Sequence, residues 1–227
     1  MKACISKYYG DKRIFDNFQI QFNKGEIVCV LGNSGVGKTT LLQILARQTS
    51  FEGALTDVPE SIGYAYQEPR LLPALTVEDN LRYVGGTDEE ITRFLQMVQL
   101  YDKKNCKAAA LSGGEKSRVS LCRAFLGDKK LVLLDEPFSS LDIPLRRKLY
   151  GVVYSLWKEK KPTVVLVTHD IEDAWALGQR IVVVGENRVA LDTPIDVDIV
   201  RPYTCVGSER LKQTIIDALT DGQTDKE

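Results

Sequence analysis

Short, mainly apolar runs recur along the chain, and each predicts a buried strand. Four of them occupy residues 26–31, 61–66, 130–134 and 163–168. A run that is apolar throughout is typical of a strand covered on both faces, as in a parallel sheet. Residues 18–22 instead alternate between apolar and polar side chains, which predicts an antiparallel strand with one covered face.

Apolar residues at helical spacing lie between these strands. The stretch 88–100 predicts an amphipathic helix, with Ile91, Phe94, Leu95 and Val98 on one face. Its helical period and lack of strand signals predict a separate helical lobe. From residue 193 the pattern weakens, and we expect 220–227 to be a frayed end.

Composition and charge narrow the class of protein. A chain of 227 residues with a net charge of −1 fits one large domain, or one domain with an inserted lobe, and shows no excess of positive charge for nucleic acid. The five cysteines form no C-x-x-C pair, which favours a reducing compartment. There is no signal-peptide pattern and no apolar run of the ~18–20 residues that cross a bilayer. We therefore expect a soluble chain that could still dock on a membrane protein.

A glycine-rich segment follows the first buried run and fits the phosphate-binding pattern G-x-x-x-x-G-K-T. Glycines let the backbone wrap around an anion, and the N–H groups of the loop and of the following helix face the phosphates. We expect Lys38 to reach the β- and γ-phosphates and the Thr39 hydroxyl to bind Mg²⁺. The alternative is a plain turn before a helix, and the loop alone does not separate kinases, GTPases and ATP-driven motors. The candidate phosphate-binding residues are Gly32, Asn33, Ser34, Gly35, Val36, Gly37, Lys38, Thr39 and Thr40.

Polar residues follow two of the other predicted strands. Asp135 and Glu136 end the run 130–134, at the strand end where ligands bind in α/β sheets. Asp135 is expected in the Mg²⁺ shell, and Pro137 is expected to hold Glu136 extended, where its carboxylate could polarise a water. His169, the only histidine, follows 163–168 and favours a phosphate contact. Solvated acids and a structural histidine are the alternatives.

A second glycine pair, Gly113 and Gly114, precedes another predicted helix and indicates a second anion site. Taken alone, this stretch is explained as well by Ser112 acting as the N-cap. Tyr8 or Tyr9 could stack on an adenine ring, although a core or surface tyrosine is at least as compatible with the pattern.

The order of the P-loop, Gln67, Leu-Ser-Gly-Gly-Glu at 111–115, Leu-Leu-Asp-Glu-Pro at 133–137, Ser-Ser-Leu-Asp at 139–142 and the strand-end histidine resembles the ATP-binding cassette (ABC) family of ATPases. The resemblance covers residues 1–227 and implies a single α/β domain. That domain would have a P-loop NTPase core with a mainly parallel sheet at 1–67 and 129–227, an antiparallel β subdomain, and an inserted α-helical subdomain at 68–128. It also implies ATP sandwiched between two chains, because two copies related by a two-fold axis can supply both glycine-rich helix starts to one nucleotide.

The resemblance gives each candidate residue a role. Lys38, Thr39 and the loop amides bind phosphates and Mg²⁺, Gln67 senses the metal and the attacking water, Asp135 orders the metal shell, Glu136 is the general base and His169 holds the γ-phosphate. Ser112 and Gly114, flanking Gly113, cap the γ-phosphate of the partner's ATP, Asp142 joins the two sites, and Tyr9 matches the adenine-stacking aromatic better than Tyr8. The sequence departs from the family pattern at Glu115, where Gln is usual, and this adds negative charge near the phosphates.

The function implied by the resemblance is the ATPase subunit of a membrane transporter, most similar to bacterial importers of the nitrate, sulfonate and taurine type. The implied partners are a second ATPase subunit in a homodimer, transmembrane permease subunits and a substrate-binding protein, with the chain peripheral on the cytoplasmic face of the membrane. The apolar, two-proline loop 68–75 is the candidate docking site, or is packed onto its own domain. A non-transport ABC ATPase of translation or chromosomes is the alternative, and a small-molecule kinase would have no use for residues 111–115.

Overall fold

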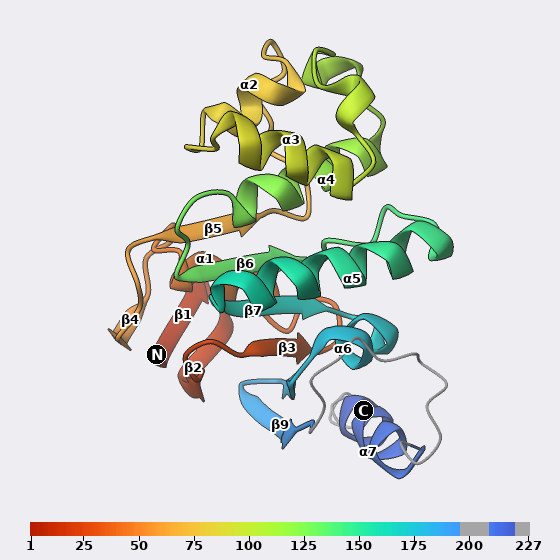
Figure 1. Ribbon diagram of the computed structural model, residues 1–227. Coiled ribbons are helices and arrows are strands. Elements are labelled where there is room, and N and C mark those ends of the chain that lie inside the picture. Colours follow the sequence, from red (N-terminus) through yellow and green to blue (C-terminus); the bar gives the residue numbers. More distant parts are fainter. Residues whose placement is uncertain (196–208, 221–227) are drawn as a thin grey trace. The chain divides into compact units, whose positions relative to one another are not determined.

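The computed structural model describes residues 1–195 and 209–220, and its contacts divide the chain into two compact units (Figure 1). The first unit combines Met1–Val58 with Thr163–Glu227, and the second is Pro59–Pro162. The predicted division into a core and a helical insertion at 68–128 stays a prediction.

A parallel sheet forms the centre of the first unit. Strand β3 (Ile27–Leu31) lies between β7 (Thr163–Thr168) and β8 (Arg180–Gly185) and is parallel to both. Strand β9 (Arg188–Pro194) extends the sheet as an antiparallel neighbour of β8. All residues of β3 and β7 are buried, as the apolar runs predicted.

A second, antiparallel sheet in this unit has the strand order β2-β1-β4. Strand β1 covers Lys2–Tyr9 and β2 covers Lys12–Gln21. In β2 the predicted alternation is present, since Phe18 and Ile20 are buried and Gln19 and Gln21 are exposed. Strand β4 (Glu52–Thr56) was not predicted, because its side chains are mostly exposed and it forms by pairing with β1.

The described part of the first unit also contains three helices: α1 (Lys38–Leu45), α6 (Ile171–Leu177) and α7 (Glu209–Thr220). Helix α7 packs beside β8 and β9, with Ile215 fully buried (Figure 1). It was not predicted: Thr220 is its last residue, and the rest of the expected frayed end, 221–227, lies outside the described residues.

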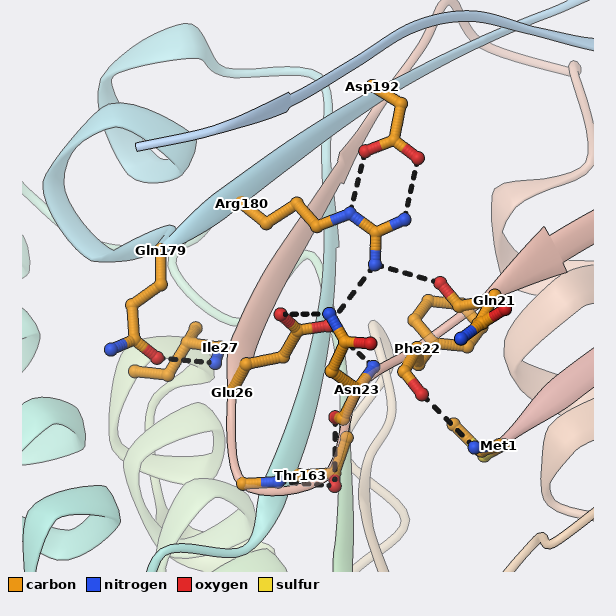
Figure 2. Close-up of polar contacts among 11 residues, drawn as sticks. Met1, Gln21, Phe22, Asn23, Glu26, Ile27, Thr163, Gln179, Arg180 and Asp192 are labelled. Carbon is orange, nitrogen blue, oxygen red and sulfur yellow. Dashed lines mark hydrogen bonds and ion pairs between the residues drawn. The ribbon is translucent and has the colours of Figure 1, made fainter. Parts of the chain in front are cut away.

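Arg180 joins the two sheets of the first unit at the start of β8 (Figure 2). Its guanidinium donates two hydrogen bonds of 2.6 Å to Asp192 on β9, one of 2.9 Å to the backbone carbonyl of Gln21 on β2, and one of 3.2 Å to Glu26. The two carboxylates raise the pKa of Arg180. This network fixes the edge of the parallel sheet opposite to the strand ends that carry the candidate site.

The second unit contains a parallel strand pair and most of the helices. Strands β5 (Ile62–Ala65) and β6 (Leu131–Asp135) are parallel neighbours. Helices α2, α3 and α4 lie together in Figure 1, and α4 also packs on β5. The helical elements are α2 (Val77–Arg82), α3 (Asp88–Met97), the 3₁₀ turns η1 (Tyr101–Lys103) and η2 (Ala108–Ala110), α4 (Gly113–Phe125) and α5 (Ile143–Lys160). Across the described ranges, no helix is both long enough and apolar enough to cross a bilayer.

Candidate nucleotide-binding site

The glycine-rich loop leaves the end of β3 and enters α1, which is the context that phosphate binding requires. Gly35 and Gly37 have φ angles of +87° and +102°, a region that side chains rarely adopt. A Cβ on Gly37 would lie 2.7 Å from both Ile14 and Phe15, whereas one on Gly35 would meet nothing within 4 Å. The loop is therefore packed against Ile14 and Phe15 at Gly37 and is open at Gly35.

Lys38 is buried, and its ammonium group bends back over this loop. It donates to the carbonyl oxygens of Gly32 at 2.7 Å and Asn33 at 3.1 Å. No side chain caps the N-terminus of α1, and the amides of a first helical turn are the groups that attract an anion. A buried cation beside an uncapped helix start and an open glycine fits the phosphates of a nucleotide. The other loop residues, Ser34, Val36, Thr39 and Thr40, are exposed or half-buried around it.

His169 lies at the same edge of the parallel sheet as the P-loop. Leu31 on β3 is paired with Thr168 on β7, so Gly32 and His169 are the residues that follow a matched pair of strand ends. The Thr168 hydroxyl accepts a hydrogen bond from the Asp170 amide at 3.0 Å and donates one to buried Asp173 at 3.0 Å, and these bonds shape the turn that carries His169. His169 itself is exposed.

Tyr9 is the last residue of β1 and is 49% exposed. The Lys7 ammonium lies 4.6 Å from the centre of its ring. Tyr8 is exposed to a similar extent, at 43%. Exposure permits stacking of an adenine on Tyr9, and that role stays a prediction.

In the second unit, the parallel pairing of β5 and β6 places Gln67 and Asp135 at one edge. Ala65 is paired with Leu134, so the two strands end at the same level of the sheet. Gln67 is exposed, whereas Asp135 is 2% exposed. The Tyr64 hydroxyl donates to Asp135 at 3.5 Å, and burial followed by the charge of Asp135 raises the pKa of Tyr64.

The backbone at Glu136 differs from the sequence prediction. We expected Pro137 to hold Glu136 extended, but its φ angle is +48°, in the left-handed region. The carbonyl oxygen of Glu136 accepts from the Ser139 amide at 3.3 Å and from the Ser139 hydroxyl at 3.0 Å, which closes a turn directly after β6. Proline favours extended backbone for the residue before it, and the turn closed by Ser139 overrides this preference. Non-glycine residues in this conformation are uncommon and concentrate at functional sites.

The second glycine pair begins α4, with Ser112 as its N-cap. The Ser112 hydroxyl accepts from the Glu115 amide at 3.3 Å, and the Glu115 carboxylate accepts from the Ser112 amide at 2.9 Å, forming a capping box. A Cβ on Gly113 would meet no atom within 4 Å, so this side of the helix start is open to a ligand.

The segment 139–142 lies against the same helix start. Gly114 faces Leu141 and Ser140, since a Cβ there would lie 3.2 Å and 3.3 Å from them, and the hydroxyls of Ser117 and Ser140 are 2.9 Å apart. Asp142 is exposed and caps α5 by accepting from the Leu145 amide at 2.9 Å. The structure thus brings together two motifs that are separated by more than twenty residues.

Three further residues near these motifs escaped the sequence analysis. Lys103 pairs with Glu115, and Arg118 donates to the Val98 carbonyl at the end of α3 at 2.8 Å. Asn80, fully buried, holds the backbone of the loop 68–75. The spacing of Arg118 four residues after Gly114 could have placed it on the same helix face, but the other two act through contacts that no local pattern reveals.

Each unit carries side chains of a kind that suits the metal that accompanies ATP. The Thr39 hydroxyl, the Gln67 amide and the Asp135 carboxylate are oxygen ligands of the kind that Mg²⁺ prefers. Among the described residues, no three His, Cys, Asp or Glu side chains gather into a metal cluster. Mg²⁺ needs no such cluster when the nucleotide phosphates supply further ligands.

A strand, a glycine-rich loop and a helix with a buried lysine define a P-loop nucleotide-binding protein. Residues 15–139 match the family model described as "ABC transporter", and curated relatives match most of the chain. The chain therefore belongs to the ABC transporter family. It is an ATPase subunit of this family, which binds ATP with Mg²⁺ and hydrolyses it to ADP and phosphate.

The similar proteins are import ATPases and solved cassettes. The aliphatic sulfonates import ATP-binding protein SsuB of Yersinia pestis is 40% identical over 203 residues, covering 85% of this chain and 75% of that protein. SsuB 1 of Burkholderia lata is 35% identical over 226 residues, covering 96% of this chain and 71% of that protein. The dimeric structure of MJ0796, described as a bacterial ABC transporter cassette, has a TM-score of 0.76 at 27% identity and covers 87% of this chain and 100% of that chain. A post-hydrolysis dimer of MJ0796 bound to ADP and Pi has a TM-score of 0.75 at 26% identity, with the same coverage.

Proposed function

We propose that this chain is the ATPase subunit of a bacterial importer for aliphatic sulfonates or chemically similar small anions. The likeness to sulfonate import ATPases over 96% of the chain carries this proposal. The importer would comprise two copies of the chain, transmembrane permease subunits and a substrate-binding protein, with the chain peripheral on the cytoplasmic face of the membrane and no nucleic acid partner. A non-transport role in translation or on chromosomes is not favoured by any relative named here.

In the first unit, the P-loop residues Gly32–Thr40 bind the phosphates. The Lys38 ammonium exchanges its two backbone carbonyl partners for phosphate oxygens, which are stronger acceptors because they are charged. His169, one residue beyond the strand end that is matched with the P-loop strand, holds the γ-phosphate. Tyr9 stacks on the adenine.

In the second unit, Glu136 acts as the general base. It is 9% exposed, and its left-handed backbone ends the regular strand directly after Asp135. Asp135 and Gln67, which follow matched strand ends, would hold the Mg²⁺, and Gln67 would also contact the attacking water. Mg²⁺, when bound, would neutralise charge that develops on the phosphates.

Ser112, Gly113, Gly114 and Asp142 act on the ATP bound by the partner copy. The contact between the glycine pair and the segment 139–142 supports this role, because one rigid surface then carries both motifs. Two copies related by a two-fold axis would each offer this surface to the other's P-loop. ATP then closes the dimer and hydrolysis reopens it.

The loop 68–75 is the proposed docking surface for the permease. Leu72 is 36% exposed, while the loop backbone is held by Asn80 and by a 2.7 Å hydrogen bond from Arg123 to the Arg70 carbonyl. A rigid loop with an exposed apolar side chain suits a partner contact. Leu72→Asp is expected to abolish transport while ATP binding stays unchanged; transport at the wild-type rate would remove this loop from the docking surface.

The first test uses Glu136→Gln, which removes the base but keeps the shape of the side chain. We expect hydrolysis to fall by about 10²–10⁴-fold, and the variant to elute as a dimer with Mg-ATP and as a monomer without it in size-exclusion chromatography. Glu89→Gln, on an exposed face of α3, is the matched control and should hydrolyse ATP normally. Normal hydrolysis by Glu136→Gln would contradict the assignment of the base.

The second test addresses transport. The chain is co-expressed with the permease subunits and binding protein of a sulfonate importer in a strain that lacks its own import ATPase. Uptake of a labelled alkanesulfonate should require the wild-type chain and be absent with Glu136→Gln. Failure to co-purify with the permease, combined with normal ATP hydrolysis, would contradict the proposed importer function but not the ATPase activity.

A further inference from the structure

Glu115 is held from two sides at the start of α4. One carboxylate oxygen accepts from the Ser112 amide at 2.9 Å, and the other accepts from the Lys103 ammonium at 2.5 Å. The Glu115 amide in turn donates to the Ser112 hydroxyl at 3.3 Å. Lys103, Glu115 and Ser112 thus form a continuous polar chain that ends at the residue proposed to contact the partner's nucleotide.

The backbone around Lys103 is fixed by neighbouring helices. The Lys103 amide donates to the Leu100 carbonyl at 3.0 Å, and its carbonyl accepts from the Cys106 amide at 2.9 Å. The next residue, Lys104, accepts from the Glu78 amide at 3.0 Å at the start of α2. Lys103 therefore presents its ammonium from a preorganised turn, although its side chain is 46% exposed.

The charge of Glu115 makes this lysine matter. Its pKa falls to about 2, with the Lys103 hydrogen bond as the largest cause, so the carboxylate is ionised at neutral pH. An anion three residues from Ser112 would repel a nucleotide phosphate at the same helix start. Because Lys103 is 46% exposed, water weakens the contribution of this pair to folding stability, and the main effect of Lys103 is on the local charge and the position of Ser112.

We propose that Lys103 is a positioning residue for the second anion site, neutralising Glu115 and holding the capping box so that the Ser112 hydroxyl donates a hydrogen bond to the γ-phosphate of ATP bound by the partner chain. This inference rests on the proposed two-chain site. It explains how the chain uses a glutamate in a phosphate-binding motif: the added charge is offset by a cation from η1, a different element.

The test measures ATP-driven dimerisation in the Glu136→Gln background. Lys103→Met should raise the ATP concentration for half-maximal dimer by about tenfold or more, a factor that corresponds to about 1.4 kcal/mol. Lys103→Met combined with Glu115→Gln should return to within about threefold of Glu115→Gln alone, because the uncompensated charge is then absent. Lys103→Arg should dimerise normally. Lys104→Met is the matched control, because it removes the same charge from the next residue without touching Glu115.

Binding of a fluorescent ATP analogue to the monomer should be equal in all variants, because the P-loop is unchanged. A Lys103→Met protein that dimerises normally, or one that the Glu115→Gln change fails to rescue, would overturn the proposed role of Lys103 but not the two-chain site. A Glu136→Gln protein that binds ATP yet stays monomeric would overturn the two-chain site and the Lys103 proposal with it.

Discussion

At Glu136 the backbone adopts a conformation that costs a non-glycine residue free energy. The turn 136–139 stabilises it through two hydrogen bonds from Ser139, so the chain leaves the regular strand directly after Asp135. The sequence predicted separate roles for Asp135 and Glu136 but not this geometry, because proline at 137 favours extended backbone for the residue before it.

The Lys103–Glu115 pair is also expected to make the stability of the chain depend on pH. The folded state depresses the pKa of Glu115 from 4.5 to about 2, so the stability that the ionised carboxylate contributes is present above pH 4.5 and is lost as the pH falls toward 2. The difference in melting temperature between the wild type and Glu115→Gln should therefore shrink as the pH falls from 5.5 to 2.5. A difference that is constant over this range would mean that the pair is not formed in solution.

Elements formed by local patterns were predictable from the sequence. The buried runs predicted β3, β6 and β7, and the serine cap predicted the start of α4. Elements that depend on distant partners were missed. Strand β4 has one half-buried leucine and forms by pairing with β1. Helix α7 is rich in polar residues, and Ile215 is its buried apolar residue. The order of the site motifs was also predictable from the sequence. The roles of Lys103 and Asn80 were not, because these residues act through contacts that form only in the folded chain.

Asn80 shows how one side chain can define a loop. It accepts from the Leu72 amide at 2.8 Å and donates to the carbonyls of Leu72 at 3.0 Å and Thr76 at 2.9 Å, with its own surface fully buried. Asn80→Ala should lower the free energy of unfolding by about 2–4 kcal/mol, because it removes three hydrogen bonds and leaves the Leu72 amide without its partner. Chemical denaturation measures this loss, and Gln96→Ala, on the exposed face of α3, should change it by less than about 0.5 kcal/mol. Equal effects of the two changes would mean that water replaces Asn80 in holding the loop.

At the scale of the whole molecule, the proposed function uses two chains, and the contact between α4 and the segment 139–142 would prepare each chain for its partner. Gly114→Ala would press a methyl group against Leu141 and Ser140 at 3.2–3.3 Å and shift one motif relative to the other. ATP-driven dimerisation should therefore weaken in the Glu136→Gln background, while the monomer keeps its fold and its affinity for ATP.

The matched control for that change is Gly151→Ala, in the middle of α5. A Cβ there would meet no atom within 4 Å, so the change should stabilise the chain by about 0.5–1 kcal/mol and leave dimerisation unaltered. Equal dimerisation by the two alanine variants would show that the contact at Gly114 does not shape the partner surface.

The Lys103–Glu115 pair also constrains how the sequence can drift. A chain that first loses Lys103 keeps an unbalanced carboxylate beside the second anion site, whereas a chain that first changes Glu115 to Gln loses only a charge that the lysine had offset. Both routes lead to the same double variant, but only the second avoids an impaired intermediate. The geometry at the start of α4 thus favours an order of mutation in which Glu115 changes before Lys103.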